Sequence, residues 1–212
     1  MNASRLKICG VRDVAFAREA ARRGIGYLGV IFAGSSPRRV TLETAREIVA
    51  ATPQVRHVGV FAGQTADEIA RLARAAALDV VQLHADTYTD GDVAHLKRCG
   101  FEVWRLEGRA DATLLDGRDG SKTGGTGRRA DWDKVRTLKA AGARVVLAGG
   151  LGPGNIAQAA ATGADILDIN SSLETAPGAK SPTRLDELLA QLESPEPKKP
   201  KIPLAVQGRI MV

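Results

Sequence analysis

Short apolar runs recur along the chain, and most are followed by a segment whose apolar positions have helical spacing. The runs are rich in β-branched residues and bounded by glycine, charged or polar residues, which is typical of buried parallel strands. The pattern predicts eight strands, at Arg5–Cys9, Gly26–Phe32, Val55–Phe61, Leu78–His84, Phe101–Leu106, Thr113–Asp116, Ala143–Ala148 and Ala164–Asn170.

The segments between these runs are amphipathic. Between residues 65 and 77, for example, Ile69, Leu72 and Ala73 fall on one helical face. Thr41, at the start of another segment, is well suited to cap a helix N-terminus. The pattern predicts seven helices, at Asp13–Arg23, Thr41–Ala51, Thr65–Ala77, Asp90–Cys99, Asp131–Ala141, Asn155–Thr162 and Pro182–Leu192.

Eight strands that alternate with helices indicate an α/β fold with a parallel sheet. An open doubly wound sheet usually carries a glycine-rich turn after its first strand. The first turn here reads CGVRD, which lacks that pattern. We therefore predict a closed eight-stranded parallel barrel, the (βα)₈ TIM barrel.

One connection is too short for a helix. Only Glu107–Ala112 separates the fifth and sixth strands, whereas a helical crossover takes a dozen or more residues. Six extended residues span about 20 Å, enough to return along a strand. We therefore expect helix 5, the helix that normally connects the fifth strand to the sixth, to be absent. Val103 or Leu114 on the uncovered strands could then meet water.

The length of 212 residues and the 44% hydrophobic content favour one core over two. We assign residues 1–193 to a single barrel domain and residues 194–212 to a Pro/Lys-rich C-terminal extension. The apolar second half of the extension could cover the gap left by the missing helix. There are two alternatives. Either a partner subunit covers the gap, or the gap is repacked and the extension is solvated.

Composition and charge exclude several classes of protein. No apolar run approaches the roughly 20 residues of a membrane helix, and Arg5 and Lys7 interrupt the region where a signal peptide would be apolar. Two cysteines are too few for a disulfide framework, so we expect a cytoplasmic protein, monomeric or homodimeric. The net charge of +6 is spread beside acidic residues, which favours a small anionic substrate over nucleic acid.

Candidate chemistry lies at the carboxyl ends of the predicted strands, where barrels of this type carry their catalytic residues. Cys9, His84, Asp116 and Asp168 stand at or near such ends, and Arg38 lies in the loop after the second strand. These five residues are the candidates for catalysis and substrate binding.

Two loops have the composition of phosphate cradles. Gly149 and Gly150 follow the seventh strand, and Ser171 and Ser172 follow the eighth. Small residues let backbone N–H groups approach an anion, and these two loops are the usual phosphate site of such barrels. The sequence therefore predicts a phosphorylated substrate.

Several motifs, in this order, carry a resemblance to a known family. They are KICG, SPRRV, VGVF, VQLH, LLDG followed by GGTG and DW, LAGGLGPGNI, and DINSSLETAPGAK. Over roughly residues 6–180 the chain resembles phosphoribosylanthranilate isomerase, the Amadori-rearranging enzyme of tryptophan biosynthesis. The resemblance implies an internal redox isomerisation of a phosphoribosyl substrate that needs neither metal nor cofactor.

The resemblance also implies the roles of three residues. Cys9 corresponds to the general base, Asp116 to the general acid, and Arg38, rather than Arg39, to the arginine that meets the anthranilate carboxylate. The chemistry needs both groups, because the ring oxygen must be protonated for opening and the adjacent carbon of the resulting Schiff base must then lose a proton. A thiol serves as the base where its surroundings favour the thiolate.

Plainer interpretations of the candidates stay open. Cys9 could be a small buried apolar residue, and Asp116 could cap a loop. His84 could orient the site or touch substrate, and Asp168 could hold a substrate hydroxyl or satisfy backbone donors. Three further residues are interpreted as structural or surface positions without metal-ligand spacing: His57, His95 and Cys99.

Three rival functions differ in their expected residues. The aminoaldose isomerase of histidine biosynthesis performs the same rearrangement but has an aspartate where this chain has Cys9. Indole-glycerol phosphate synthase uses strand-end lysines, whereas Lys7 here is followed by the cysteine motif. A non-catalytic phosphate-binding barrel would not need both Cys9 and Asp116.

The chain departs from the usual family residues at Ala85, Ala130, Ser172 and Ser181, which suggests a divergent branch.

Overall fold

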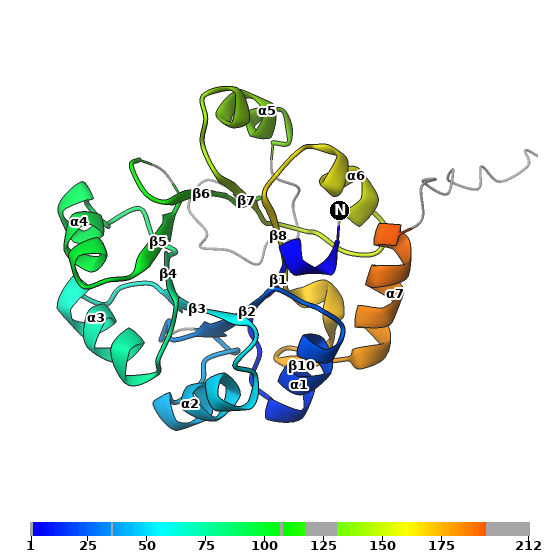
Figure 1. Ribbon diagram of the computed structural model, residues 1–212, viewed down its shortest axis with the longest axis horizontal. Helices are drawn as coiled ribbons and strands as arrows, with labels where there is room; N and C mark the ends of the chain where they lie inside the picture. The colour runs from blue at the N-terminus through cyan, green and yellow to red at the C-terminus, as the bar shows by residue number, and fades with distance from the viewer. Residues whose placement is uncertain (1, 35, 107, 118–130, 194–212) are drawn as a thin grey trace, which may run out of the picture.

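The computed structural model describes residues 2–34, 36–106, 108–117 and 131–193, and the predicted closed barrel of eight parallel strands is confirmed. Figure 1 shows the strands as a ring that is surrounded by the helices. The strands are β1 (Leu6–Ile8), β2 (Tyr27–Ile31), β3 (Arg56–Phe61), β4 (Val80–Leu83), β5 (Glu102–Arg105), β6 (Ala112–Leu115), β7 (Val145–Leu147) and β8 (Ile166–Ile169). Each strand pairs in parallel with the next, and β8 closes the ring on β1.

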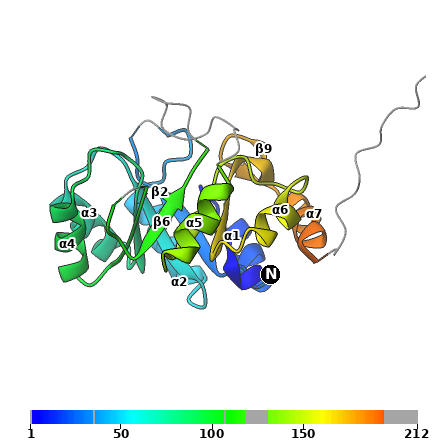
Figure 2. The ribbon, with the colours of Figure 1, turned by 90° about the horizontal axis from the view of Figure 1, so that it is seen from above.

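The helices form the outer layer, as the side view also shows (Figure 2). They are α1 (Val14–Arg22), α2 (Leu42–Ala51), α3 (Ala66–Ala75), α4 (Asp90–Arg98), α5 (Asp133–Ala140), α6 (Ile156–Ala161) and α7 (Pro182–Glu193). Two 3₁₀ turns, η1 (Ala3–Arg5) and η2 (Ser171–Leu173), and a hairpin of β9 (Glu174–Ala176) and β10 (Ala179–Lys180) complete the described elements. None of the helices in these residue ranges is long and apolar enough to cross a membrane.

Capping residues begin several helices. Thr41 accepts a hydrogen bond from the N–H of Thr44 at the start of α2, as its position in the sequence indicates. Thr65 and Thr89 form capping boxes with the acidic residue three positions on. Ser181, one of the departures from the family pattern, accepts from the N–H of Arg184 and so caps α7.

Alternation along the strands divides apolar side chains into an outer and an inner layer. On β1, Leu6 and Ile8 are fully buried in the cluster beneath the helices. Lys7 and Cys9, the alternate positions, face the barrel interior. The interior below the rim is filled by residues such as Trp104 and Val146. The same alternation therefore directs Cys9 to the mouth of the barrel and Lys7 to the layer beneath it.

The connection between β5 and β6 corrects one expectation. The described residues of this connection, 106 and 108–111, form no helix. Nevertheless Val103 is 0% exposed and Leu114 is 1% exposed, so the expectation that either meets water is wrong. Leu114 packs inside the barrel with Trp104, and Asp111 accepts a hydrogen bond from the N–H of Val103. The extension at 194–212, which was considered as a cover, lies outside the described residues.

Candidate active site

The carboxyl ends of the strands meet at one rim, and the candidate residues gather there. Cys9 follows β1, His84 follows β4, Asp116 follows β6, and Asp168 belongs to β8. Cys9 is 6% exposed and Asp168 is 7% exposed, so both lie within the mouth of the barrel and not on its outer surface. The rim thus combines a thiol, an imidazole and two carboxyl groups.

Asp168 forms a buried ion pair with Lys7. The Lys7 Nζ lies 2.6 Å from the Asp168 Oδ2, and the lysine side chain is fully buried. The other oxygen, Oδ1, is also buried and has no hydrogen-bond partner within the part of the chain that the structure describes. Among the described residues, Asp168 Oδ1 therefore satisfies no backbone donor. One oxygen holds a cation, and the other is left for a further donor.

Cys9 lies between the Lys7–Asp168 pair and the rim. Gly29 on β2 faces it, because a Cβ placed on Gly29 would be 3.2 Å from the Cys9 Sγ and 3.1 Å from the Lys7 Cε. Burial raises the pKa of the Cys9 thiol, the positive charge of Lys7 opposes that rise, and the negative charge of Asp168 adds to it. The protonation state of Cys9 thus depends on the balance between burial and the surrounding charges.

His84 and Asp116 approach each other from opposite sides of β5. The His84 Nε2 lies 3.5 Å from the Asp116 Oδ2. Gly149 closes over the same aspartate, since a Cβ there would lie 2.3 Å from the backbone nitrogen of Gly117 and 2.9 Å from the Asp116 Oδ1. The φ of +87° at Gly149 also favours glycine. The loop after β7 therefore packs directly against the carboxyl group after β6.

Arg38 is held by a carboxylate from the β9–β10 hairpin. Its Nε and Nη2 donate to the two oxygens of Glu174 at 2.8 and 2.7 Å, a bidentate ion pair. The Lys180 Nζ also donates to Glu174 at 2.8 Å and to the Asn170 Oδ1 at 2.8 Å. Arg39, in contrast, is exposed to solvent. Of the two adjacent arginines, only Arg38 is ordered against the rim.

The Glu174 carboxylate gives folding a pH dependence of known sign. Burial favours the neutral carboxyl, but hydrogen bonds from Arg38 and Lys180 outweigh burial and lower the Glu174 pKa from 4.5 to about 2. Such a group stabilises the fold fully above its unfolded pKa, and the stabilisation is lost as the pH falls from 4.5 to about 2. We expect Glu174→Gln to lower the free energy of unfolding at neutral pH by on the order of 3 kcal/mol.

Urea denaturation at a series of pH values measures this effect. The wild-type stability is expected to decline with acid below pH 4.5, and the Glu174→Gln variant is expected to decline less steeply over the same interval. Asp133→Asn, which changes an exposed carboxylate, is the control and should retain the wild-type slope. Equal slopes in the wild type and in Glu174→Gln would contradict this assignment.

The two glycine- and serine-bearing loops are linked by a hydrogen bond. The Ser172 Oγ donates to the carbonyl of Leu151 at 2.6 Å, so the hydroxyl is engaged with the loop after β7. Gly149 and Gly150 both have positive φ, which curls that loop. Ser171 and Ser172 begin η2, whose internal bond runs from the N–H of Leu173 to the carbonyl of Asn170. The opening N–H groups of such a turn lack intrahelical acceptors and suit an anion.

Three charged residues of the site were not singled out from the sequence as site residues. Lys7 could have been found, because it alternates with Cys9 and must share its face of the strand. Glu174 and Lys180 flank a Pro-Gly pair, which is a turn signal between two short strands. The ion pair between Glu174 and Arg38 spans 136 residues and leaves no local signal.

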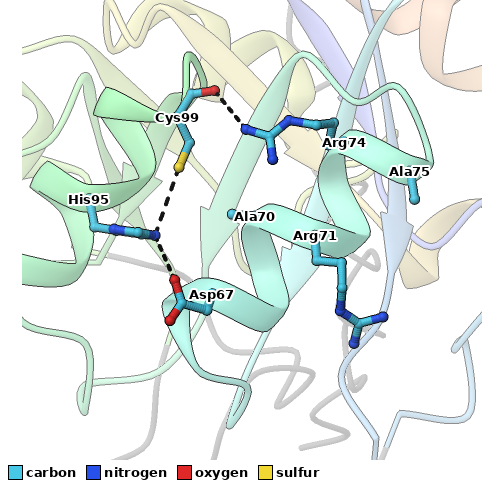
Figure 3. A pocket seen from close by; sticks show the side chains of 7 residues that line it. All are labelled: Asp67, Ala70, Arg71, Arg74, Ala75, His95 and Cys99. Carbon is cyan, nitrogen blue, oxygen red and sulfur yellow. Dashed lines mark hydrogen bonds and ion pairs between the residues drawn. The ribbon is translucent and has the colours of Figure 1, made fainter.

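The remaining histidines and the second cysteine lie away from the rim. His57 is buried and its Nε2 lies 2.9 Å from the Thr52 Oγ1. Figure 3 shows His95 and Cys99 in a groove between α3 and α4, where the His95 Nε2 meets Asp67 at 3.0 Å. Within the described ranges, no group of three or more histidine, cysteine or acidic residues is arranged to hold a metal ion.

Comparisons with known proteins agree with each other. The family model of N-(5′-phosphoribosyl)anthranilate isomerase matches residues 6–191. The N-(5′-phosphoribosyl)anthranilate isomerase of Citrifermentans bemidjiense is 35% identical over 200 residues, which cover 89% of this chain and 96% of the relative. The crystal structure of the Thermus thermophilus phosphoribosylanthranilate isomerase has a TM-score of 0.78 at 36% identity and covers 89% and 98% of the two chains.

A more distant structure shares the fold. It holds monomers of the dimeric phosphoribosylanthranilate isomerase of Thermotoga maritima, with a TM-score of 0.74 at 24% identity over 91% of this chain and 98% of that one.

Proposed function

The chain belongs to the N-(5′-phosphoribosyl)anthranilate isomerase family and is an aldose–ketose isomerase of tryptophan biosynthesis, and we propose that Cys9 is its general base and Asp116 its general acid. The reaction is the Amadori rearrangement of N-(5-phosphoribosyl)anthranilate to 1-(2-carboxyphenylamino)-1-deoxyribulose 5-phosphate.

Asp116 is proposed to protonate the furanose ring oxygen, which opens the ring and leaves a Schiff base. Cys9 as thiolate then removes the proton from the adjacent sugar carbon, and the resulting enaminol becomes the ketose product. The two steps need an acid and a base that face the same substrate from different strands. Supporting this proposal, Cys9 follows β1 and Asp116 follows β6 in one closed barrel, and both are near Asp168.

The observation that carries the proposal is the pairing of a buried strand-end thiol with a carboxyl group across the same rim. The rival isomerase of histidine biosynthesis would use an aspartate at the Cys9 position. Purified protein should therefore be assayed on both aminoaldose substrates. We expect turnover of phosphoribosylanthranilate and none above background of the histidine-pathway aminoaldose. Equal turnover of both would favour a bifunctional enzyme, and turnover of the second alone would refute the proposal.

Arg38 is proposed to bind the anthranilate carboxylate. Because Glu174 occupies one edge of its guanidinium, the substrate would meet the other edge. A charge-assisted hydrogen bond contributes about 1.5–3 kcal/mol, so Arg38→Ala is expected to lower kcat/KM about 10–100-fold. Arg39→Ala, the matched control in an exposed neighbour, should change kcat/KM less than about twofold. Steady-state kinetics in which Arg39 matters more than Arg38 would refute the assignment.

His84 and Asp168 are proposed to complete the substrate site. Asp168 has a buried Oδ1 that lacks a hydrogen-bond donor among the described residues, and a substrate hydroxyl would supply one. His84, 3.5 Å from Asp116, can orient the acid or reach the substrate itself.

The loops carrying Gly149, Gly150, Ser171 and Ser172 are proposed to bind the substrate phosphate. We expect inorganic phosphate or sulfate to inhibit competitively with phosphoribosylanthranilate, because each would occupy the same backbone N–H groups. Chloride at equal ionic strength is the control, since it screens charge without fitting the cradle. Inhibition that does not raise the apparent KM would contradict this placement of the phosphate.

A cytoplasmic location is part of the proposal, because the pathway uses soluble phosphorylated intermediates. The assembly is proposed to be a monomer or a homodimer, the second by analogy with the dimeric Thermotoga maritima enzyme.

A further inference from the structure

Lys7 is a fully buried charge that the proposed mechanism does not use. We propose that Lys7 is a positioning residue for the general base: its ammonium, fixed by Asp168, faces Cys9 and favours the Cys9 thiolate. This inference rests on the proposed role of Cys9, and it identifies what allows a buried thiol to act as a base.

The geometry brings the two side chains together. Lys7 and Cys9 are alternate residues at the end of β1, so both project into the barrel. The space above Gly29 is filled by both side chains, since one Cβ position there would contact the Lys7 Cε at 3.1 Å and the Cys9 Sγ at 3.2 Å. The missing side chain of Gly29 thus permits this close approach. Any larger residue would push the lysine and the cysteine from their shared space.

A buried thiolate needs a nearby cation. Transfer from water to the barrel mouth disfavours the charged form, which is why burial raises the pKa of Cys9. Among the charges that oppose this rise, Lys7 acts most strongly and Lys180 on β10 acts more weakly. Arg38, in the loop after β2, also lies within reach of the Cys9 charge. Both Arg38 and Lys180 donate to Glu174, which neutralises part of their positive charge.

Asp168 keeps the Lys7 ammonium charged. Burial alone would lower the pKa of Lys7, but the charges of Asp168 and Cys9 outweigh burial and raise it. The 2.6 Å contact also fixes the direction of the ammonium, because the buried stem has no solvent to move into. The same carboxylate repels a Cys9 thiolate. Asp168 therefore acts on Cys9 in two ways, directly as a negative charge and indirectly by holding the Lys7 ammonium in place.

The test is a titration of the Cys9 thiol in the absence of substrate. The thiolate absorbs in the ultraviolet. Subtracting the absorbance of the Cys9→Ala/Cys99→Ser variant from that of the Cys99→Ser variant isolates the contribution of Cys9. Lys7→Met is expected to raise the Cys9 pKa by about 1–3 units, the effect of removing an opposite charge at close range. Lys139→Met removes a lysine that pairs with Asp165 outside the site, and it should leave the Cys9 pKa unchanged.

Two further measurements decide the outcome. Should Lys7→Met fail to fold with an unpaired Asp168, the double variant Lys7→Met/Asp168→Asn replaces the ion pair by a neutral pair and should still raise the Cys9 pKa. The limb of the kcat/KM profile that comes from Cys9 should move to higher pH by the same amount as the thiol pKa, which a merely structural lysine would not cause.

An unchanged Cys9 pKa in the lysine variants would overturn the inference. The titration needs no turnover, so it reports on Lys7 even if Cys9 is not the base. Failure of the proposed function would instead appear as full activity of Cys9→Ala.

Discussion

Cys9→Ala is expected to lower kcat about 10²–10⁴-fold, the usual effect of removing a positioned general base. The substitution removes only the sulfur from a small side chain that packs against Ile31 and Val60, so the barrel should fold normally. Without the thiolate, no group at the end of β1 can accept the proton from the sugar carbon. Single-turnover and steady-state rates on phosphoribosylanthranilate measure the loss, and circular dichroism checks the fold.

Cys99→Ala is the matched control for this experiment. Cys99 lies in the groove between α3 and α4 and follows the last residue of α4, away from the rim (Figure 3). Its removal should leave kcat within about twofold of wild type, as expected for a substitution distant from the chemistry. A Cys9→Ala enzyme that keeps more than roughly a third of the wild-type kcat would show that Cys9 is not the base.

Asp116→Asn is expected to lower kcat by a similar factor of about 10²–10⁴. Asparagine has nearly the same shape, so the packing against Gly149 and the approach to His84 can persist. The amide, however, cannot deliver a proton to the ring oxygen. Asp111→Asn is the control, because Asp111 stands just before β6 and pairs with Lys97 outside the barrel mouth.

The pH dependence separates the two roles. Activity requires the Cys9 thiolate and the protonated Asp116 together, so kcat/KM should have a bell-shaped pH profile with one limb from each group. The limb that comes from Asp116 should be missing from the residual activity of Asp116→Asn. An Asp116→Asn enzyme with wild-type kcat, or with both limbs intact, would refute the role of Asp116.

The barrel could be predicted because each strand combines a short apolar run with a following amphipathic helix. The period-2 pattern failed at β6, where Leu114 and Leu115 are adjacent and both apolar. Such a pair does not show which side chain faces the interior. The structure places Leu114 inside and buries Val103 although the described residues after β5 form no helix. Sequence periodicity describes single strands, whereas burial depends on how the neighbouring segments fold over them.

The candidate site could be located from the strand ends, but its charge arrangement could not. Cys9, His84, Asp116 and Asp168 follow from the rule that barrels place catalysis at the carboxyl ends of strands. The partner of Lys7 lies 161 residues away, and that of Arg38 lies 136 residues away. A lysine or glutamate in a short strand gives no local sign that it will be buried, because only the paired residue makes its burial tolerable. These pairings therefore appear only in the folded chain.

We propose that this chain catalyses the isomerisation of phosphoribosylanthranilate through Cys9 and Asp116. The most direct test follows the fluorescence of freshly made phosphoribosylanthranilate after addition of purified protein. Fluorescence is expected to disappear at a rate proportional to the concentration of wild-type enzyme. With the Cys9→Ala/Asp116→Asn double variant, it should disappear only at the rate of the uncatalysed background. A wild-type rate equal to that background, or a double variant as fast as the wild type, would contradict this proposal.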